Sequence, residues 1–231
     1  MDNKSMNEFL NESGFQVLNP ADTFKFECIC CGNCCRHVKN SVMVESLDLF
    51  RIACHFKMDT KRIVNMYTDV VILSRGFPML TLKSNYSLDT CIFMNSGKCS
   101  IHNVKPRACR LFPLTAGPDD KEQNNFISFF ASEEHRHHFN GKEYKINDWL
   151  AENLTQDDRE FVQLDYSFVK EFGKQIGQID ENNNARVVYL MLFYRFYNFD
   201  INQNFKSQFV RNMARLKNEL KKLVVQNPNT R

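Results

Sequence analysis

The sequence predicts a mainly α-helical protein with a small module of irregular loops and short strands that binds metal, an α+β fold. Nine cysteines stand among 231 residues, and most of them fall in two clusters. Apolar residues recur at helical spacing after residue 155, and "FPMLTL" (77–82) alternates like a short strand. We therefore expect a polar lead-in at 1–20, a cysteine-cluster domain at 21–118, and a mostly helical region at 119–231 packed on it.

Two helices are predicted within the cysteine-cluster domain. Ser46 would cap the first, whose apolar face carries Leu47, Phe50 and Cys54. Asp59 or Thr60 would cap the second, which places four apolar residues at helical spacing: Ile63, Met66, Tyr67 and Val70. A further short helix is expected in the lead-in, around residues 7–13.

The second half of the chain predicts three helices and one strand. Gly117 and Pro118 mark a break, and "NFISFF" (125–130) follows as a strand. Thr155 and Asp158 form a capping-box pattern ahead of a long helix. Its apolar face consists of Phe161, Leu164, Phe168, Phe172 and Ile176. A fourth helix is expected at 185–199, and a fifth carries Phe205, Phe209, Leu216, Leu220 and Leu223.

Composition places the chain among ordinary globular proteins. The net charge of +3 gives no strong case for nucleic acid as a partner. The most apolar stretch, 187–199, is too short to span a bilayer and contains Arg195, and the N-terminus lacks the pattern of a signal peptide. We therefore expect a cytoplasmic protein with no membrane partner, whose odd number of cysteines does not form a disulfide framework.

The spacing of the cysteines is that of metal ligands. The first cluster reads Cys28-x2-Cys31-x2-Cys34-Cys35, and the second set is Cys91, Cys99 and Cys109. Gly32 would allow a positive φ, so that amide N–H groups face the sulfur atoms. Thiolates this close repel one another unless a cation neutralises them. Cys30 is surplus to the pattern, and Cys54 is interpreted as a buried, inert cysteine on a helix face.

Seven candidate ligands exceed the four thiolates of one zinc ion or one cubane cluster. We expect an iron–sulfur cluster or non-haem iron, with zinc as the alternative. Adjacent Cys34 and Cys35 should point in different directions. This predicts one site from Cys28, Cys31, Cys34 and Cys109, and a second from Cys35, Cys91 and Cys99. Three histidines are weaker candidates for additional ligands: His37, His55 and His102.

The residues from 24 to 114 resemble the CxxCxxCC family, whose domain is described as zinc- or iron-chelating. The resemblance rests on the first cluster with Gly32, on "SLDLFRIA", and on "CIFMNSGKCSIHNVKPRACRLFP". Cys30 and Lys105 depart from the family pattern. The resemblance implies a metal centre at the seven cysteines. Some flagellin lysine methylases carry a related cluster, which implies modification of a protein or peptide as one alternative activity.

Three functional readings remain open from the sequence. The first is an iron-containing metal-binding protein, with or without redox activity. The second is a structural zinc module of an interaction protein with a protein or peptide partner. The third is a protein- or peptide-modifying enzyme. Lys105, Arg107 and Arg110 either offset thiolate charge, bind an anion, or are surface charge. "HRHH" (135–138) is more typical of a solvated loop than of a metal site. No phosphate loop or hydrolase triad is present.

Overall fold

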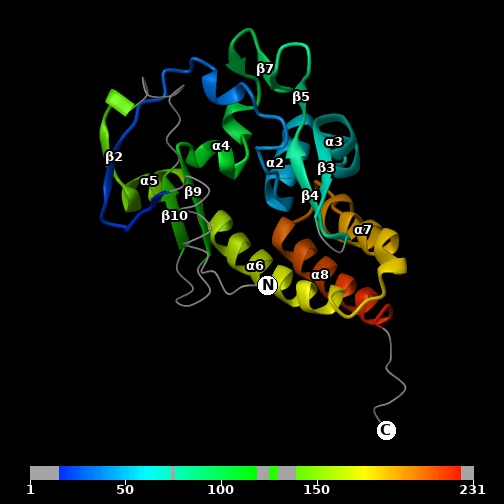
Figure 1. Ribbon diagram of the computed structural model, residues 1–231. Helices are drawn as coiled ribbons and strands as arrows, with labels where there is room; N and C mark the ends of the chain where they lie inside the picture. The colour runs from blue at the N-terminus through cyan, green and yellow to red at the C-terminus, as the bar shows by residue number, and fades with distance from the viewer. Residues whose placement is uncertain (1–15, 74–75, 119–124, 130–138, 225–231) are drawn as a thin grey trace.

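The computed structural model describes residues 16–73, 76–118, 125–129 and 139–224. The expected helix at 7–13 and the "HRHH" segment lie outside these residues. Helices form most of the described fold (Figure 1). The α-helices are α2 (Ser46–Phe56), α3 (Thr60–Tyr67), α4 (Arg107–Leu111), α5 (Ile146–Asn153), α6 (Gln156–Ile176), α7 (Asn184–Leu192) and α8 (Phe205–Lys221). Shorter turns are η1 (Asn33–Cys35), η3 (His102–Val104), η5 (Glu181–Asn183) and the π-helical η6 (Phe193–Tyr197).

The strands are short and pair in antiparallel fashion. One sheet has the order β1–β10–β9, and four two-stranded pairs are β2–β11, β3–β4, β5–β6 and β7–β8. Their bounds are β1 (Gln16–Val17), β2 (Thr23–Lys25), β3 (Thr68–Ile72), β4 (Pro78–Leu82), β5 (Ser84–Asn85), β6 (Thr90–Cys91), β7 (Met94–Asn95), β8 (Lys98–Cys99), β9 (Leu114–Pro118), β10 (Asn125–Phe129) and β11 (Glu143–Lys145). The predicted α+β class is therefore confirmed, including the strands expected around 77–82 and 125–130.

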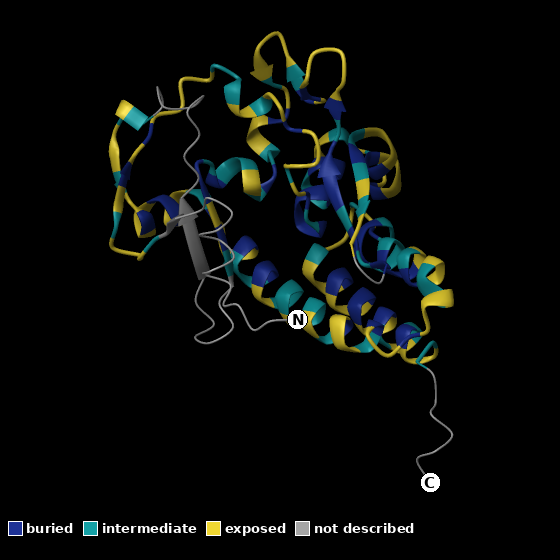
Figure 2. Ribbon diagram, viewed as in Figure 1, coloured by how far each residue is buried: buried dark blue, intermediate teal, exposed yellow. Residues whose placement is uncertain are grey.

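Apolar side chains form three clusters, each built by different elements. The first joins α6, α7 and α8 around Phe172, Phe209 and Met213. The second joins α2, α3 and β4 to the cysteine segments. The third packs β2, α4 and β9 against α5 around Trp149. Figure 2 shows the buried sides of α6 and α8 turned toward their neighbours. The helical half thus has a core that contains no cysteine.

The capping box at Thr155 and Asp158 forms as predicted and starts α6. Phe161, Phe172 and Ile176 of its apolar face are buried. The helix expected at 185–199 is interrupted, because α7 ends at Leu192 and a π-helical turn follows. That turn buries both Phe196 and Arg195, so a charged side chain sits inside the fold.

Three details of the first two helices were predicted wrongly. Glu45, rather than Ser46, is the cap of α2, and its N–H donates to the Asp48 carboxylate at 3.3 Å. The apolar face of α3 also differs: Ile63 is buried as predicted, but Met66 is exposed, and Val70 lies beyond the helix in β3. Cys54 is also exposed, and its thiol donates to the Ile201 carbonyl at 3.7 Å. Helical spacing predicted which side of each helix is buried, but not which of the neighbouring residues on that side meets the core.

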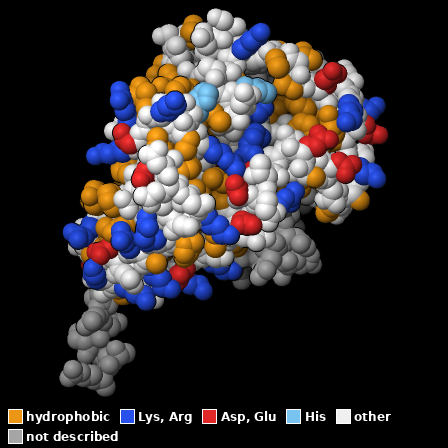
Figure 3. Space-filling view, turned by 180° about the vertical axis from the view of Figure 1, so that it is seen from behind, with side chains coloured by type: hydrophobic (Ala, Val, Ile, Leu, Met, Phe, Trp, Pro, Cys, Tyr) orange, Lys and Arg blue, Asp and Glu red, His pale blue; other side chains and the backbone are white. Residues whose placement is uncertain are grey.

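The C-terminal region shares structure with the cysteine-cluster domain. Strand β11 pairs with β2 over three residues, and α5 packs against α4. The boundary at residue 118 stays a prediction. None of the helices described is long and apolar enough to cross a membrane. On the face shown in Figure 3, basic and acidic side chains are interspersed rather than gathered by sign.

Candidate metal centre

The first cysteine cluster lies on a loop that turns sharply at Gly32. Its φ of 75° is positive, as the sequence predicted, and the Asn33 N–H points to the Cys31 sulfur at 3.4 Å. A Cβ at position 32 would lie 2.8 Å from the Met94 methyl carbon and 3.0 Å from the Gly97 carbonyl oxygen. Only glycine therefore allows this loop to approach the β7–β8 hairpin.

Backbone contacts hold the end of this loop beside the second cysteine segment. Arg36 forms a β-bridge with Thr90, and the His37 N–H donates to the Asp89 carbonyl at 2.9 Å. Cys35 precedes Arg36, and Cys91 follows Thr90. The antiparallel bridge therefore brings the two cysteines together. Cys91 pairs with Ser84 across β5–β6, and Cys99 pairs with Met94 across β7–β8. Two short hairpins thus place two more cysteines next to the loop.

The third contribution comes from α4, which carries Cys109. Its first N–H, that of Arg107, donates to the Asp48 carboxylate at 2.9 Å and docks α4 on the start of α2. Cys109 then lies within electrostatic reach of Cys34, Cys91 and Cys99. Five of the seven predicted ligands are therefore brought together from three separate segments: Cys34, Cys35, Cys91, Cys99 and Cys109.

This crowding disfavours ionised thiols when no cation is present. The Cys34 hydrogen bond, burial, and the charges of nearby cysteines raise the pKa of Cys35 far above its ordinary value. Burial, followed by the charges of Cys91 and Cys34, raises the pKa of Cys109. Burial is also the main cause of the raised pKa of Cys91 and of Cys99. A bound soft cation would favour the ionised form of each of these thiols. The donor set therefore fits a thiolate-bound metal.

The predicted division into two ligand sets differs from this arrangement. Cys34 and Cys35 are hydrogen-bonded to each other, and Cys35 lies near both Cys91 and Cys109. Cys28 and Cys30 instead interact with one another at the exposed start of the loop. The reason is the β-bridge at Arg36, which fixes the end of the loop while its start runs over the surface. Sequence spacing alone could not reveal this unequal attachment.

Among the described residues, no three cysteine, histidine, aspartate or glutamate side chains already stand in an arrangement that would hold a metal ion. To bind a common ion, the cysteine side chains would have to rotate toward one centre. Each of the three candidate histidines contacts a side chain other than cysteine. His37 pairs with Asp89, His55 packs edge-on against Phe56, and His102 lies 3.5 Å from the Lys105 ammonium.

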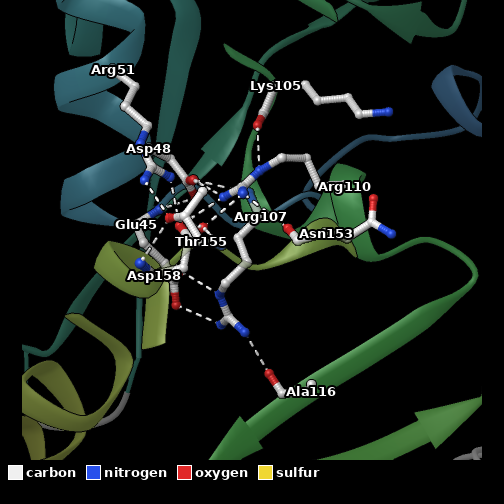
Figure 4. Close-up of polar contacts among 10 residues, drawn as sticks. All are labelled: Glu45, Asp48, Arg51, Lys105, Arg107, Arg110, Ala116, Asn153, Thr155 and Asp158. Atoms are coloured by element: carbon white, nitrogen blue, oxygen red, sulfur yellow. Dashed lines mark hydrogen bonds and ion pairs between the residues drawn. The ribbon is translucent and has the colours of Figure 1, made fainter. Parts of the chain in front are cut away.

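The basic residues around Cys109 have separate roles (Figure 4). Arg107 binds Glu45 through two hydrogen bonds of 2.7 Å, and Arg110 binds Asp158 through two of 2.8 Å. Both guanidinium groups are therefore paired with carboxylates, a role that was not among the alternatives left open by the sequence. Lys105 is the basic residue that acts on the cysteines, because its charge lowers the pKa of Cys99 against the effect of burial.

The ion pairs made by the carboxylates of this network were not predicted, although Asp158 was expected in the capping box of α6. Asp158 accepts hydrogen bonds from Arg110, Thr155 and Arg51, and they hold its pKa well below the ordinary value although burial alone would raise it. Asp48 is also buried, and burial followed by the charge of Glu45 raises its pKa to about 7. The spacing Glu45-x2-Asp48 before an apolar run was the available signal, since it resembles an N-terminal capping pattern.

Replacing Cys30 or Cys54 by serine is expected to leave metal stoichiometry unchanged. Both side chains are exposed, and neither has Cys34, Cys91 or Cys109 among the groups that shift its pKa. Surface substitutions of this kind change stability by about 0.5 kcal/mol or less. Metal content per protein chain is the measurement, with Cys91→Ser as the variant expected to lose metal. A loss of metal in Cys30→Ser or Cys54→Ser would show that the ligand set is misassigned.

Comparison with known protein families matches residues 27–145 to the CxxCxxCC family, described as "Putative zinc- or iron-chelating domain". The match starts just before Cys28 and ends with β11, so it includes all seven candidate ligands and the strand that pairs with β2. No curated protein and no solved structure matches the chain significantly. The family match covers just over half of the 231 residues, and the chain belongs to the CxxCxxCC family.

Proposed function

We propose that this protein binds iron through its cysteine cluster, as an iron–sulfur cluster or as non-haem iron. The observation that carries the proposal is the convergence of Cys34, Cys35, Cys91, Cys99 and Cys109 from a loop, two hairpins and a helix. Five neighbouring thiols, with Cys28 and Cys31 in the same loop, exceed the four ligands of a closed zinc site. An iron–sulfur cluster at these residues would supply one-electron transfer.

A structural zinc ion is the second candidate, and the short hairpins support it. Strands β5 to β8 have two residues each, which is too few for independent stability in water. A closed zinc site would staple them to α4. An enzyme that modifies a protein or peptide is a third candidate, supported by a cavity whose wall includes Arg107 of the same helix that carries Cys109.

Metal and acid-labile sulfide content of anaerobically purified protein distinguishes these candidates. We expect iron with a brown colour, and sulfide in equal amount if the iron is held as a cluster. Cys34→Ser combined with Cys109→Ser should remove the colour, while Cys54→Ser serves as the matched control. A colourless, fully folded protein that contains stoichiometric zinc would contradict the iron proposal and support the structural zinc ion.

A further inference from the structure

A cavity of about 390 Å³ lies between the cysteine-cluster domain and the helical region. Strand β4 and the segment before α2 form one side, β9 and α6 form another, and the π-helical turn η6 contributes Arg195 and Phe196. Most of its wall is apolar, including Met43, Met79 and Val169. Ligand sites in proteins have this size and composition, with a few polar groups that fix orientation.

Arg195 supplies hydrogen-bonding capacity that the protein does not use. Only 6% of the residue is exposed, and its guanidinium packs over the rings of Phe77 and Phe196 at 5.2 and 5.3 Å. Nη2 donates to both oxygens of Asp165, at 2.9 and 3.0 Å. Nε is buried without a partner, and Nη1 makes no hydrogen bond to the residues that the structure describes. Nε is closed off from the cavity, so Nη1 is the donor that an acceptor in the cavity would meet, and a hydrogen bond to a charged donor is favourable.

The charges on the cavity wall already balance. Arg195 pairs with Asp165, and Arg107 pairs with Glu45. All four of these residues line the cavity. A charged ligand would therefore add a buried charge with no free counter-ion, which costs more than a neutral acceptor of the same shape. The unpartnered Nη1 donor of Arg195 and the balanced charges of the wall together select an uncharged molecule that carries a hydrogen-bond acceptor.

We propose that this cavity binds an uncharged small molecule whose carbonyl oxygen accepts a hydrogen bond from Arg195 and whose apolar body lies against Met43, Met79 and Val169. Its volume corresponds to about a dozen non-hydrogen atoms, since each water in the liquid occupies about 30 Å³. The π-helical turn that positions Arg195 is a rare element that is found mainly at functional sites. No cysteine lines the cavity, and Arg107 of its wall belongs to α4, the helix that carries Cys109.

Three probes of nearly equal shape test both parts of the proposal. They are 4-phenyl-2-butanone, n-butylbenzene and 3-phenylpropanoate, titrated against the purified metal-bound protein with methyl-labelled methionine. We expect the ketone to bind about tenfold more tightly than n-butylbenzene, because it gains a hydrogen bond to a charged donor. We expect 3-phenylpropanoate to bind at least tenfold more weakly than the ketone. Equal binding of ketone and hydrocarbon would overturn the role of Arg195, and tighter binding of the carboxylate would overturn the charge argument.

The methionine methyl signals locate the ligand without any substitution. Met43 and Met79 line the cavity, whereas Met66 lies outside it. Met43 and Met66 have similar exposed fractions, 39% and 42%, so they are matched for accessibility. The ketone should shift the Met43 and Met79 signals and show contacts to both, while Met66 stays unchanged. Equal shifts at Met66, or no saturable shift at any methionine, would refute the site.

A cavity-filling variant provides the second line of evidence. Val169→Phe adds a ring to the cavity wall without removing the Arg195–Asp165 pair. It should weaken ketone binding at least tenfold. Val210→Phe is the control, because Val210 is an exposed valine on α8 that does not line the cavity. Unchanged binding in Val169→Phe would place the ligand elsewhere and refute the proposal. If Val169→Phe does not fold, the methyl contacts in the unsubstituted protein decide.

Discussion

Removal of the metal is expected to lower the melting temperature by roughly 20–40 °C. The ligands come from residues 28–35 and 91–109, so the ion closes a long loop between them, and its binding free energy becomes folding free energy. Structural zinc supplies on the order of 10 kcal/mol in small domains. Each kcal/mol shifts the midpoint of a chain this long by roughly 2–4 °C. This expectation rests on the proposed metal centre.

Scanning calorimetry with and without a chelator measures this effect, and reconstitution with the original metal is the control. Hydrogen exchange should localise the loss. Amides in the hairpins β5 to β8 and in α4 should lose protection, while α6 and α8 should keep theirs, because their core around Phe172 and Phe209 contains no cysteine. An apoprotein that melts cooperatively at the temperature of the metal-bound form would contradict the prediction.

Replacing Asp158 by alanine is expected to destabilise the protein by about 3–5 kcal/mol, the usual cost of breaking a buried ion pair. Only 2% of the Asp158 side chain is exposed, and it is hydrogen-bonded to Arg110, Arg51 and Thr155. The substitution leaves two arginines without their carboxylate and removes the capping box of α6. It therefore loosens the contact between α6 and the helix that carries Cys109.

Urea unfolding at neutral pH measures this loss, and a pH series tests its electrostatic origin. The pKa of Asp158 is held below its ordinary value in the folded state. Its contribution is therefore fully present above the unfolded pKa of about 3.9 and is lost as the pH falls below it. The difference between the wild type and Asp158→Ala should shrink over that range. Glu160→Ala, on the same helix and in an exposed pair with Lys206, is the control and should change stability much less.

Sequence periodicity predicted α6 and α8, but it missed α5 and the π-helical turn that ends α7. The face from Phe161 to Ile176 repeats at helical spacing and is bounded by a capping box, so local signals agree with burial. The same method failed at Cys54 and Met66. An apolar face at helical spacing is several residues wide, so spacing does not decide which of them is buried. In these two helices Ala53 and Val64 are buried, and Cys54 and Met66 are exposed. The residue that meets the core is decided by the angle at which the next element packs.

The sequence by itself predicted seven cysteines at ligand spacing as candidate ligands, and it determined that Gly32 takes a positive φ. Spacing reports which side chains are near one another along the chain. The tertiary structure alone decided that Cys35 lies with Cys91 and Cys109, because the Arg36–Thr90 bridge joins segments more than fifty residues apart. It also decided that Arg107 and Arg110 face carboxylates and that Arg195 faces a cavity. Partners of buried charges come from distant elements, and no local pattern records them.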